Sequence, residues 1–564
     1  MNELASADYV VITSFFVVML SIGFYFRNRM KSMFDFFGGG KQVPWWLGGI
    51  SFYMCSFSAL AFVMYSALAY RYGFVAVTIW WVSVPIVFLV TRLFACRWRR
   101  LAENSPLEYI ENRYGNKMRQ SLVLLGLPTR ILDDALKLLA IGTVVAVGMG
   151  FPLRPAIIIS GLIMVSYTFM GGLWATLVAD FIQFIVLVAA VAVLPFLALE
   201  KVGGISNFIA QAPDGFFDFT TPKYSYVYLF VMMVILFLNY STSWALVQRF
   251  YSAKNDRNAR KVGYLVAILN IIGPPVFYLP AMMTRIFVPD IPVEEMNGVY
   301  AIMCKSLLPV GMLGMVIAAM FAATMSTLAG DFNAISSVLT NDVFKRVIFP
   351  KASNRILMTA SRVNTLIVGL LIIGITFFLQ KAQGSDDLIR VMVKIFGIFL
   401  PPVAIPMLLG MLTPKVSKSG GLAGLIAGIC SGLLAFFLSK KYPVLLYEPV
   451  ILSITSITTF LGLCVGTLVL PDRGERAGQV IAFFERLNNP DIKKTEEQDV
   501  PCKGFSPFPM IGIGIAFIGI VLACTVFVSG SLKESIMSVI VGLSMAAVGL
   551  IFIYLGCRDR KAVK

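Results

Sequence analysis

Long apolar runs recur along the whole chain, and they constrain its fold more than any other feature. A run of roughly 18 residues or more is long enough to cross the ~30 Å hydrocarbon core of a bilayer as a helix. Lipid offers an exposed backbone no hydrogen-bond partners, so a spanning segment must be a helix or part of a closed barrel. Barrel strands alternate apolar and polar residues, whereas stretches such as VLVAAVAVLPFLAL do not. The sequence therefore predicts an all-α polytopic membrane protein.

The loops between the apolar runs carry most of the net charge of +17. We count about fifteen candidate transmembrane helices, centred near residues 17, 58, 85, 133, 163, 187, 236, 274, 325, 368, 400, 430, 459, 518 and 545. With the N-terminus outside, this count puts the basic clusters in the cytoplasm, as the positive-inside rule requires. The clusters are residues 27–31, 92–100, 113–119, 249–261, 345–355, 415–418, 473–486 and 558–564, with Lys440 and Lys441 as the main exception. We expect an integral protein of a bacterial inner or plasma membrane with a cytoplasmic C-terminus and no nucleic-acid partner.

The chain divides at its longest polar stretch. Residues 471–507 contain NNPDIKKTEEQD and are expected to form a solvated cytoplasmic linker. This linker separates a transmembrane domain, residues 1–470, from two additional helices in residues 508–564. The first apolar run, residues 9–26, follows acidic rather than basic residues, so it is interpreted as a retained helix and not as a signal peptide.

Several classes of catalytic site are excluded by composition. The chain has no histidine, which rules out Ser-His hydrolases and the HExxH metal site. Its eight cysteines form no CxxC pair, and no GxxxxGK[ST] nucleotide loop occurs. A membrane-embedded transferase would have to use Asp133 and Asp134, the one plausible carboxylate pair, and a sensor would need a soluble signalling domain after the membrane core. Neither reading is favoured, and we expect a transporter and not an enzyme.

Two predicted spans carry polar interruptions typical of broken helices. The second span contains GGISFYMCSFSAL, which includes Ser58, and the seventh contains FLNYSTSWALVQR, which includes Asn239. The two spans lie five apart, and matched interruptions in two halves indicate an inverted repeat with a binding site near the midplane. Backbone carbonyls freed at such a break can bind a small cation. The alternative is that the serines bond to their own helix or to a neighbour.

Charged and hydroxyl side chains within three spans mark further candidates. Asp180 is an ionisable residue in an apolar span and so a functional hypothesis by default, unless it lies at a cytoplasmic helix end. Ser326 and Thr327 place adjacent hydroxyls about one turn from Asp331, a weak-field oxygen set that suits sodium better than a divalent ion. In the fourth span, LPTRILDDALKLLAIG, Arg130 shares one helix face with acidic and basic neighbours. That face is either an internal ion-pair ladder or the wall of a solute cavity.

Three motifs identify a family. They are GGGKQVPWWLGGIS, YTFMGGLWATLVADFIQ and LPVGMLGMVIAAMFAATMSTLAGDFNAISSVLTNDVFK. The chain resembles the sodium:solute symporters, which include sodium/glucose, sodium/proline, sodium/sialic-acid and sodium/monocarboxylate cotransporters, over roughly residues 5–470. The resemblance implies a leucine-transporter-type core of five plus five inverted helices, with repeats at about 45–200 and 225–412. One helix precedes this core and several follow it.

The resemblance also implies a sodium site, since sodium is the co-transported ion of the family and no organic cofactor is expected. Its ligands would be carbonyls of Met54, Phe57 and Ala323 and hydroxyls of Ser326 and Thr327. Asp180 matches a carboxylate near the family's sodium pathway. Some members bind a second sodium through two further hydroxyls, which appear here as Ala329 and Gly330. This departure predicts one sodium per transport cycle, unless Asp331 compensates.

The solute is less tightly defined by the resemblance. Positions that bind galactose in some members correspond here to Ala61, Trp80 and Asn270, which does not fit that hexose pocket, although Ser83 matches a sugar-contacting serine. Arg130 matches an arginine that holds the solute carboxylate in sialic-acid-type members, and a guanidinium binds a carboxylate through two parallel hydrogen bonds. We therefore expect a sodium symporter that imports a sugar acid or monocarboxylate by alternating access. A neutral sugar or a proline-type amino acid is the alternative, and Asp133 or Asp134 could instead pair with Arg130. The candidate solute-binding residues are Ser58, Ser83, Arg130, Asn239 and Asn270.

Overall fold

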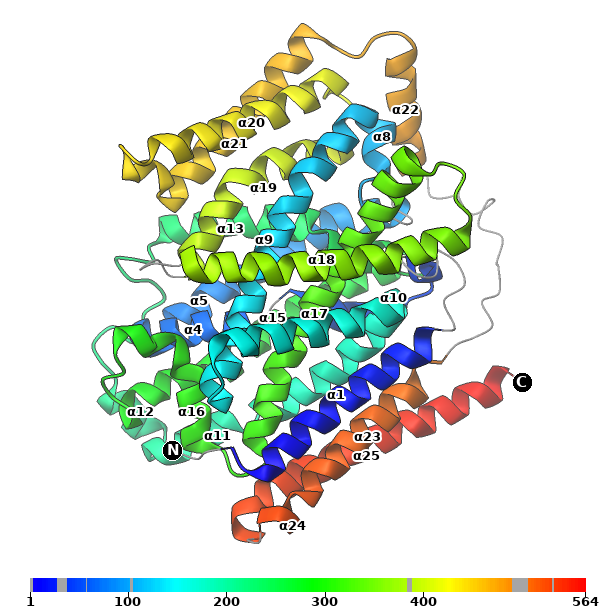
Figure 1. The fold of residues 1–564 in the computed structure, drawn as a ribbon. Helices are drawn as coiled ribbons and strands as arrows, with labels where there is room; N and C mark the ends of the chain where they lie inside the picture. The colour runs from blue at the N-terminus through cyan, green and yellow to red at the C-terminus, as the bar shows by residue number, and fades with distance from the viewer. Residues whose placement is uncertain are drawn as a thin grey trace.

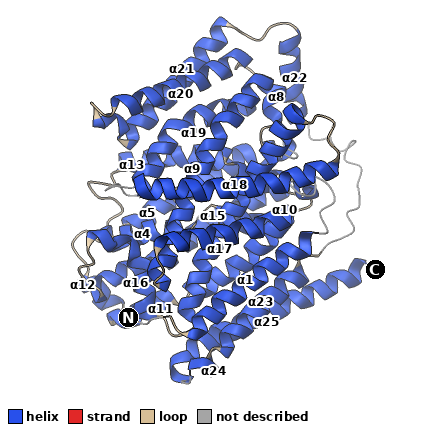
Figure 2. Ribbon diagram, in the orientation of Figure 1, coloured by secondary structure: helices blue, strands red, loops and turns tan. Residues whose placement is uncertain are grey.

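The protein is all-helical in the computed structural model, which describes residues 4–27, 38–56, 58–101, 105–382, 388–488, 506–529 and 532–563. Figures 1 and 2 show a stack of helices with α17 near its centre. The first helices are α1 (Ser6–Arg27), α3 (Trp45–Cys55), α4 (Ala59–Tyr72), α5 (Val75–Trp81), α6 (Ser83–Val90), α7 (Cys96–Leu101), α8 (Glu108–Tyr114), α9 (Asn116–Met149), α10 (Leu153–Val191), α11 (Leu194–Val202) and α12 (Ile205–Gln211). The next are α13 (Tyr226–Thr242), α14 (Trp244–Tyr251), α15 (Asp256–Phe287), α16 (Val299–Leu307), α17 (Met312–Val338), α18 (Asn354–Ala382) and α19 (Leu388–Leu412). The last are α20 (Lys418–Leu438), α21 (Glu448–Val469), α22 (Glu475–Asn488), α23 (Phe508–Cys524), α24 (Val526–Ser529) and α25 (Leu532–Val563). Short 3-10 or π segments are η1 (Gly39–Lys41), η2 (Thr91–Ala95), η3 (Val293–Gly298), η4 (Leu339–Ile348) and η5 (Pro443–Leu446).

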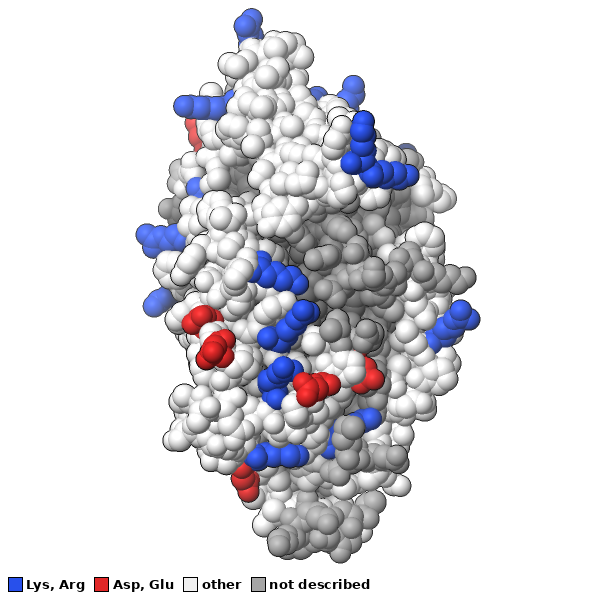
Figure 3. Space-filling model, turned by 90° about the vertical axis from the view of Figure 1, so that its left-hand side faces the viewer, with Lys and Arg blue, Asp and Glu red and all other residues white. Residues whose placement is uncertain are grey.

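Ten helices of the described residues are long and apolar enough to span a bilayer, or twelve if each of two bent pairs counts as one span. The predicted count of fifteen is therefore not confirmed. The difference lies in α9, which carries several charged residues along its length, and in two shorter apolar helices, Leu153–Ser166 and Phe508–Cys524. The integral membrane character itself rests on the ten spans and on the apolar outer faces of helices such as α18, α20 and α21. Figure 3 shows one face of the molecule, on which charged side chains of both signs lie scattered over a mostly uncharged surface.

Both predicted interruptions are breaks between helices. α13 ends at Thr242 and α14 begins at Trp244, with an angle of 53° between them. Ser243 between them has an extended backbone, and its N–H donates to the carbonyl of Asn239 over 2.7 Å. In the other pair α3 ends at Cys55 and α4 begins at Ala59, and Ser58 before α4 is again extended. The polar, small residues thus occur where the helical hydrogen-bond ladder stops.

α17 forms the centre of the bundle, and every one of its residues is buried. It packs against α10, α1, α18 and α9 and against α3, α4 and α14 of the broken pairs. A helix that is apolar on all sides belongs inside a bundle, and small residues along it let neighbours approach closely. The closest approach is at Gly314, where an added Cβ would lie 2.4 Å from the backbone oxygen of Asp8 on α1. The side chain of Asp8 accepts hydrogen bonds from the N–H groups of Gly311 and Gly314 over 2.9 and 2.7 Å, which fixes α1 to the start of α17.

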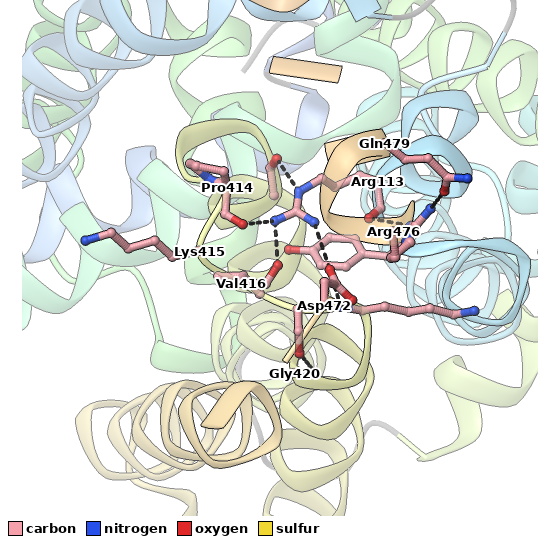
Figure 4. Close-up of polar contacts among 12 residues, drawn as sticks. Arg113, Pro414, Lys415, Val416, Gly420, Asp472, Arg476 and Gln479 are labelled. Carbon is pink, nitrogen blue, oxygen red and sulfur yellow. Dashed lines mark hydrogen bonds and ion pairs between the residues drawn. The ribbon is translucent and has the colours of Figure 1, made fainter. Parts of the chain in front are cut away.

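Arg113 of α8 is fully buried and joins three parts of the chain (Figure 4). Its guanidinium donates to backbone carbonyls at the end of α19 and in the loop that follows, namely those of Gly410, Thr413, Pro414 and Val416. Asp472 lies 3.9 Å from the same guanidinium, and Arg476 of α22 donates to the backbone carbonyl of Arg113 over 2.9 Å. We call this set of contacts the Arg113 clasp. The expected polar linker therefore includes a helix, α22, that packs on α8, while residues 489–505 of the linker lie outside the described residues.

The two terminal helices form a closely packed pair, α23 and α25, that lies along α1 (Figure 1). Glycines permit this contact, since an added Cβ at Gly519 or Gly542 would lie 2.6 or 2.5 Å from the backbone oxygen of the other. The pair also reaches the core, because Phe508 stacks on Trp46 with ring centroids 5.3 Å apart. The predicted C-terminal helices are thus packed against the first helix of the transmembrane domain.

Candidate functional site

A cavity of about 200 Å³ opens where the two broken helices meet α5, α6, α9, α17 and α19. Four of the five predicted solute-binding residues line it: Ser58, Ser83, Arg130 and Asn239. Ser58 and Asn239 arrive there because each borders a helix break, and Arg130 because α9 crosses the bundle beside α17. The hydroxyl oxygen of Ser83 is buried and has no hydrogen-bond partner among the described residues, so it remains available to a solute.

The fifth residue, Asn270, is not among the residues that line the cavity. It is buried on α15, and its side-chain oxygen accepts a hydrogen bond of 3.1 Å from the indole of Trp80. Trp80 does line the cavity and packs edge-on against Tyr65, with ring centroids 5.1 Å apart. Asn270 thus positions an aromatic wall instead of facing the cavity itself. The residue type was informative, but the sequence could not tell that the indole would lie between the amide and the cavity.

Arg130 extends from α9 to the break between α13 and α14. Its guanidinium lies 3.3 Å from the carbonyl of Thr242, 3.4 Å from the hydroxyl of Ser243 and 4.8 Å above the ring of Trp244. Its acidic partner is Asp331 of α17, at 3.6 Å. The partners Asp133 and Asp134, which the sequence had left open, pair with Lys137 instead. The guanidinium therefore lines the cavity while it is paired with the carboxylate of Asp331.

Lys137 is surrounded by three carboxylates. Its ammonium lies 2.8 Å from Asp133, 3.0 Å from Asp134 and 2.9 Å from Asp331. The charged helix face predicted from the spacing thus forms ion pairs within α9, through Asp133 and Asp134, and an ion pair with α17, through Asp331. Oxygens of the three carboxylates lie within 4.8 Å of one another, a spacing that suits a metal ion, but the Lys137 ammonium already contacts all three. Fully ionised, the three carboxylates exceed Arg130 and Lys137 by one negative charge.

The predicted sodium ligands converge where α17 passes the end of α3. The hydroxyl of Thr327 lies 3.0 Å from the carbonyl oxygen of Ala323 and 3.4 Å from that of Met54. Ser326 contacts the same helix end, since its carbonyl accepts from the Cys55 thiol at 3.2 Å. The Met54 carbonyl is available because α3 stops one residue later. Phe57, the remaining predicted ligand, lies outside the described residues.

Asp180 is fully buried and lies beside this cluster of oxygens. It is eight positions after Gly172, where φ of 59° and ψ of −164° kink α10. Its carboxylate accepts from the hydroxyl of Ser51 on α3 and forms an ion pair with Arg249 at 3.5 Å, both side chains having no exposed surface. Asp180 is therefore an interior residue and not a carboxylate at an exposed helix end.

Arg249 is the residue that the sequence analysis misplaced, because it was counted with a basic loop cluster. It lies on α14, all of whose residues are buried. Its guanidinium donates to the hydroxyl of Ser51 over 3.0 Å and to the thiol of Cys55 over 3.0 Å. It also lies beside Gly330, where an added Cβ would come within 3.3 Å of the guanidinium and 2.9 Å of the Cys55 sulfur. Its position only two turns after a predicted helix break was the signal that it belonged to the interior.

Known proteins resemble the chain over most of its length. The model of the sodium:solute symporter family matches residues 36–428. The sodium/sialic acid symporter SiaT of Proteus mirabilis is 26% identical, over 77% of this chain and 90% of that protein. The sodium/glucose cotransporter of Vibrio parahaemolyticus is 24% identical, over 81% of this chain and 91% of that protein.

A solved structure shares the fold. The substrate-bound, outward-open state of a Na+-coupled sialic acid symporter superposes with a TM-score of 0.73 at 22% identity, covering 83% of this chain and 98% of that one. The family match covers more than half of the chain and includes both broken helices, the Arg130 cavity and the oxygen cluster around Thr327. The chain therefore belongs to the sodium:solute symporter family and is a sodium-coupled membrane transporter, not an enzyme.

Proposed function

We propose that the protein imports a small acidic solute, a sugar acid or monocarboxylate, together with one sodium ion per cycle. The observation that carries the solute class is Arg130, whose guanidinium lies in the wall of the central cavity beside a helix break. Arginine is the side chain best suited to bind a carboxylate through two hydrogen bonds. Sialic acid, the solute in the names of several relatives, is itself a sugar acid.

The sodium site of this proposal comprises Met54, Phe57, Ala323, Ser326 and Thr327. Three neutral oxygens already lie together: the Thr327 hydroxyl, and the carbonyls of Met54 and Ala323 at 3.4 and 3.0 Å from it. Neutral oxygens form the weak-field environment that sodium prefers. Sodium would join α3 to α17, and Asp180 would attract the ion on its path. Bridging these two helices lets sodium favour the conformation in which the solute cavity is complete.

The single sodium follows from charge balance around Asp180. The Asp180 carboxylate would otherwise attract a second cation, but the Arg249 guanidinium is already paired with it at 3.5 Å. Gly330 leaves room for that guanidinium, while it supplies no hydroxyl to a metal. The positive charge of Arg249, which is covalently part of the protein and does not dissociate, thus takes the place of a second sodium ion.

The remaining features complete the proposal. Residues 45–200 and 225–412 would be the inverted core repeats, and rocking of one repeat against the other would expose the cavity alternately to each side. The N-terminus would lie outside and the C-terminus in the cytoplasm of a bacterial inner or plasma membrane. The apolar helices contact the bilayer, and no nucleic acid is involved.

A neutral sugar is the second candidate solute, and one observation favours it. Within the part of the chain that the structure describes, the Ser83 hydroxyl lines the cavity without a hydrogen-bond partner, so it can bind a sugar hydroxyl in either kind of solute. Against a purely neutral solute stands the partly buried guanidinium of Arg130 in the cavity wall, which a neutral sugar would not need.

The test is uptake by proteoliposomes that contain the purified protein. Sialic acid, glucuronate, lactate, glucose and proline are supplied with an inward gradient of sodium, of potassium or of protons. We expect the acidic solutes to accumulate only with sodium, and Ser326→Ala with Thr327→Ala to abolish the sodium dependence. Arg130→Ala should abolish acidic uptake and spare any neutral uptake. Equal uptake with potassium or protons would refute sodium coupling, and acidic uptake by Arg130→Ala would refute the assigned solute site.

A further inference from the structure

We infer that Asp331 is a resident competitor for Arg130: its carboxylate occupies the guanidinium in the empty transporter, and the carboxylate of an acidic solute takes its place. The inference rests on the proposed function, because it assumes that Arg130 binds the solute. It assigns to Asp331 the role of a positioning residue that sets solute affinity.

The contacts of Asp331 show one carboxylate shared between two cations. It lies 3.6 Å from the Arg130 guanidinium and 2.9 Å from the Lys137 ammonium. Both cations belong to α9 and both line the cavity, but the contact with Arg130 is the longer of the two. When a solute carboxylate approaches Arg130, Asp331 can give up the longer contact and keep the shorter one. No buried charge is left without a partner during the exchange, which would otherwise be costly.

The carboxylate that pairs with Arg130 also matters for an anionic solute. Its negative charge repels an anion from the guanidinium unless that carboxylate moves away. Asp133 and Asp134 form ion pairs with Lys137 at 2.8 and 3.0 Å, whereas Asp331 forms one with Arg130. Asp331 is therefore the carboxylate whose displacement frees the guanidinium.

The position of Asp331 on α17 connects this exchange to sodium. It follows Thr327 by four positions, so both side chains lie on the same face of one helix, and both line the cavity. Thr327 belongs to the proposed sodium site, and Asp331 is bound to the proposed solute site. A sodium ion that fixes this turn of α17 also fixes the position from which Asp331 competes. The helix turn thus provides a direct physical path by which one ligand can alter the affinity for the other.

A comparison of two isosteric variants tests the inference. Asp331→Asn and Asp133→Asn each remove one negative charge from the cluster, each from a residue that lines the cavity and contacts Lys137. Only Asp331→Asn removes the ion pair with Arg130. Dissociation constants for sialic acid, glucuronate and lactate, with glucose as the neutral control, are measured by calorimetry on purified protein at saturating sodium. Saturating sodium removes any effect that acts through the Thr327 site, and Arg130→Ala is measured in parallel.

We expect Asp331→Asn to tighten the binding of the acidic solute about tenfold, the equivalent of one modest ion pair. Asp133→Asn should give at most about a threefold change from long-range charge alone, and neither variant should alter glucose binding. If Arg130→Ala loses the binding of acidic solutes, the proposed function stands. In that case, equal effects of the two aspartate variants, or weaker binding of the acidic solutes by Asp331→Asn, would overturn the competitor role. If Arg130→Ala binds the acidic probes as well as wild type, or wild type binds only glucose, the proposed function itself fails.

Discussion

The buried pair of Asp180 and Arg249 gives the sharpest prediction for stability and ion binding together. Arg249→Met keeps an unbranched, flexible side chain and removes the charge, so the Asp180 carboxylate loses the ion pair that now spans 3.5 Å between two side chains without exposed surface. Breaking such a pair by removing one partner costs about 3–5 kcal/mol, because it leaves a buried charge uncompensated. The remaining hydrogen bond from Ser51 offsets only part of this cost. We expect a markedly lower melting temperature for purified Arg249→Met in detergent without sodium.

Sodium should restore much of what this variant loses. The uncompensated carboxylate lies beside the proposed sodium cluster, so a small cation can take over the role of the guanidinium and stabilise the folded state by binding to it. Arg249→Met should therefore gain more melting temperature from sodium than wild type does, whereas N-methylglucamine, which is too large for the site, should give no gain. Asp180→Asn combined with Arg249→Met removes both charges, so it should be more stable than Arg249→Met alone and lose the extra gain from sodium. This reasoning would be refuted if Arg249→Met were as stable as wild type without sodium. It would also be refuted if the double variant kept the extra increase in melting temperature that sodium gives to Arg249→Met.

Three further predictions concern parts of the fold outside the site. Gly314→Ala puts a Cβ 2.4 Å from the backbone oxygen of Asp8, and the backbone cannot move aside as the end of a side chain can. We therefore expect about 1–3 kcal/mol of destabilisation, measured as a lower melting temperature. The control Gly374→Ala meets no atom within 4 Å and should leave the melting temperature unchanged. Arg113→Lys retains the charge but cannot reach four carbonyls at once, so limited proteolysis should cut the loop after α19 faster than in wild type; equal rates would contradict the clasp. Partial burial raises the pKa of Glu111, but the hydrogen bonds and charges of Arg346 and Arg119 together outweigh it and lower the pKa. The contacts therefore stabilise the protein above the ordinary pKa of glutamate and are lost as the pH falls through the lowered value, so Glu111→Gln should flatten the dependence of melting temperature on acid pH.

Much of the fold could be predicted from local sequence patterns. Apolar length predicts spans, and small polar residues predict where a helix stops, so both breaks were found in advance. α9 shows the limit of that reasoning, because the sequence predicts a span near residue 133, but the charged face of the helix keeps it out of the ten helices that are apolar enough to span a bilayer. α22 was read as linker because its composition is polar, and its packing against α8 depends on residues more than 350 positions away in the sequence.

Four of the five candidate solute-binding residues line the cavity, but the sequence does not predict how the charged residues around them pair. Helical spacing identified the charged face of α9, yet spacing within one helix cannot tell that Asp331, 194 positions after Lys137, completes the cluster. Arg249 was assigned to a loop because basic residues follow it, and only the packing of α14 against α3 and α17 places it inside. The polar amide of Asn270 suits a binding residue, but the sequence cannot predict that this side chain hydrogen-bonds to Trp80 and does not line the cavity.

The Arg113 clasp has a consequence for how the transporter can move. The last carbonyls of α19 lack partners within their own helix, and a helix end left in this state would fray or turn to water. Here the guanidinium of a different helix supplies those partners, while α22 holds the same residue from its other side. α8, the end of α19 and α22 are consequently one mechanical part, and any motion that alternates access must carry all three together or break a fully buried arginine out of its carbonyl cage.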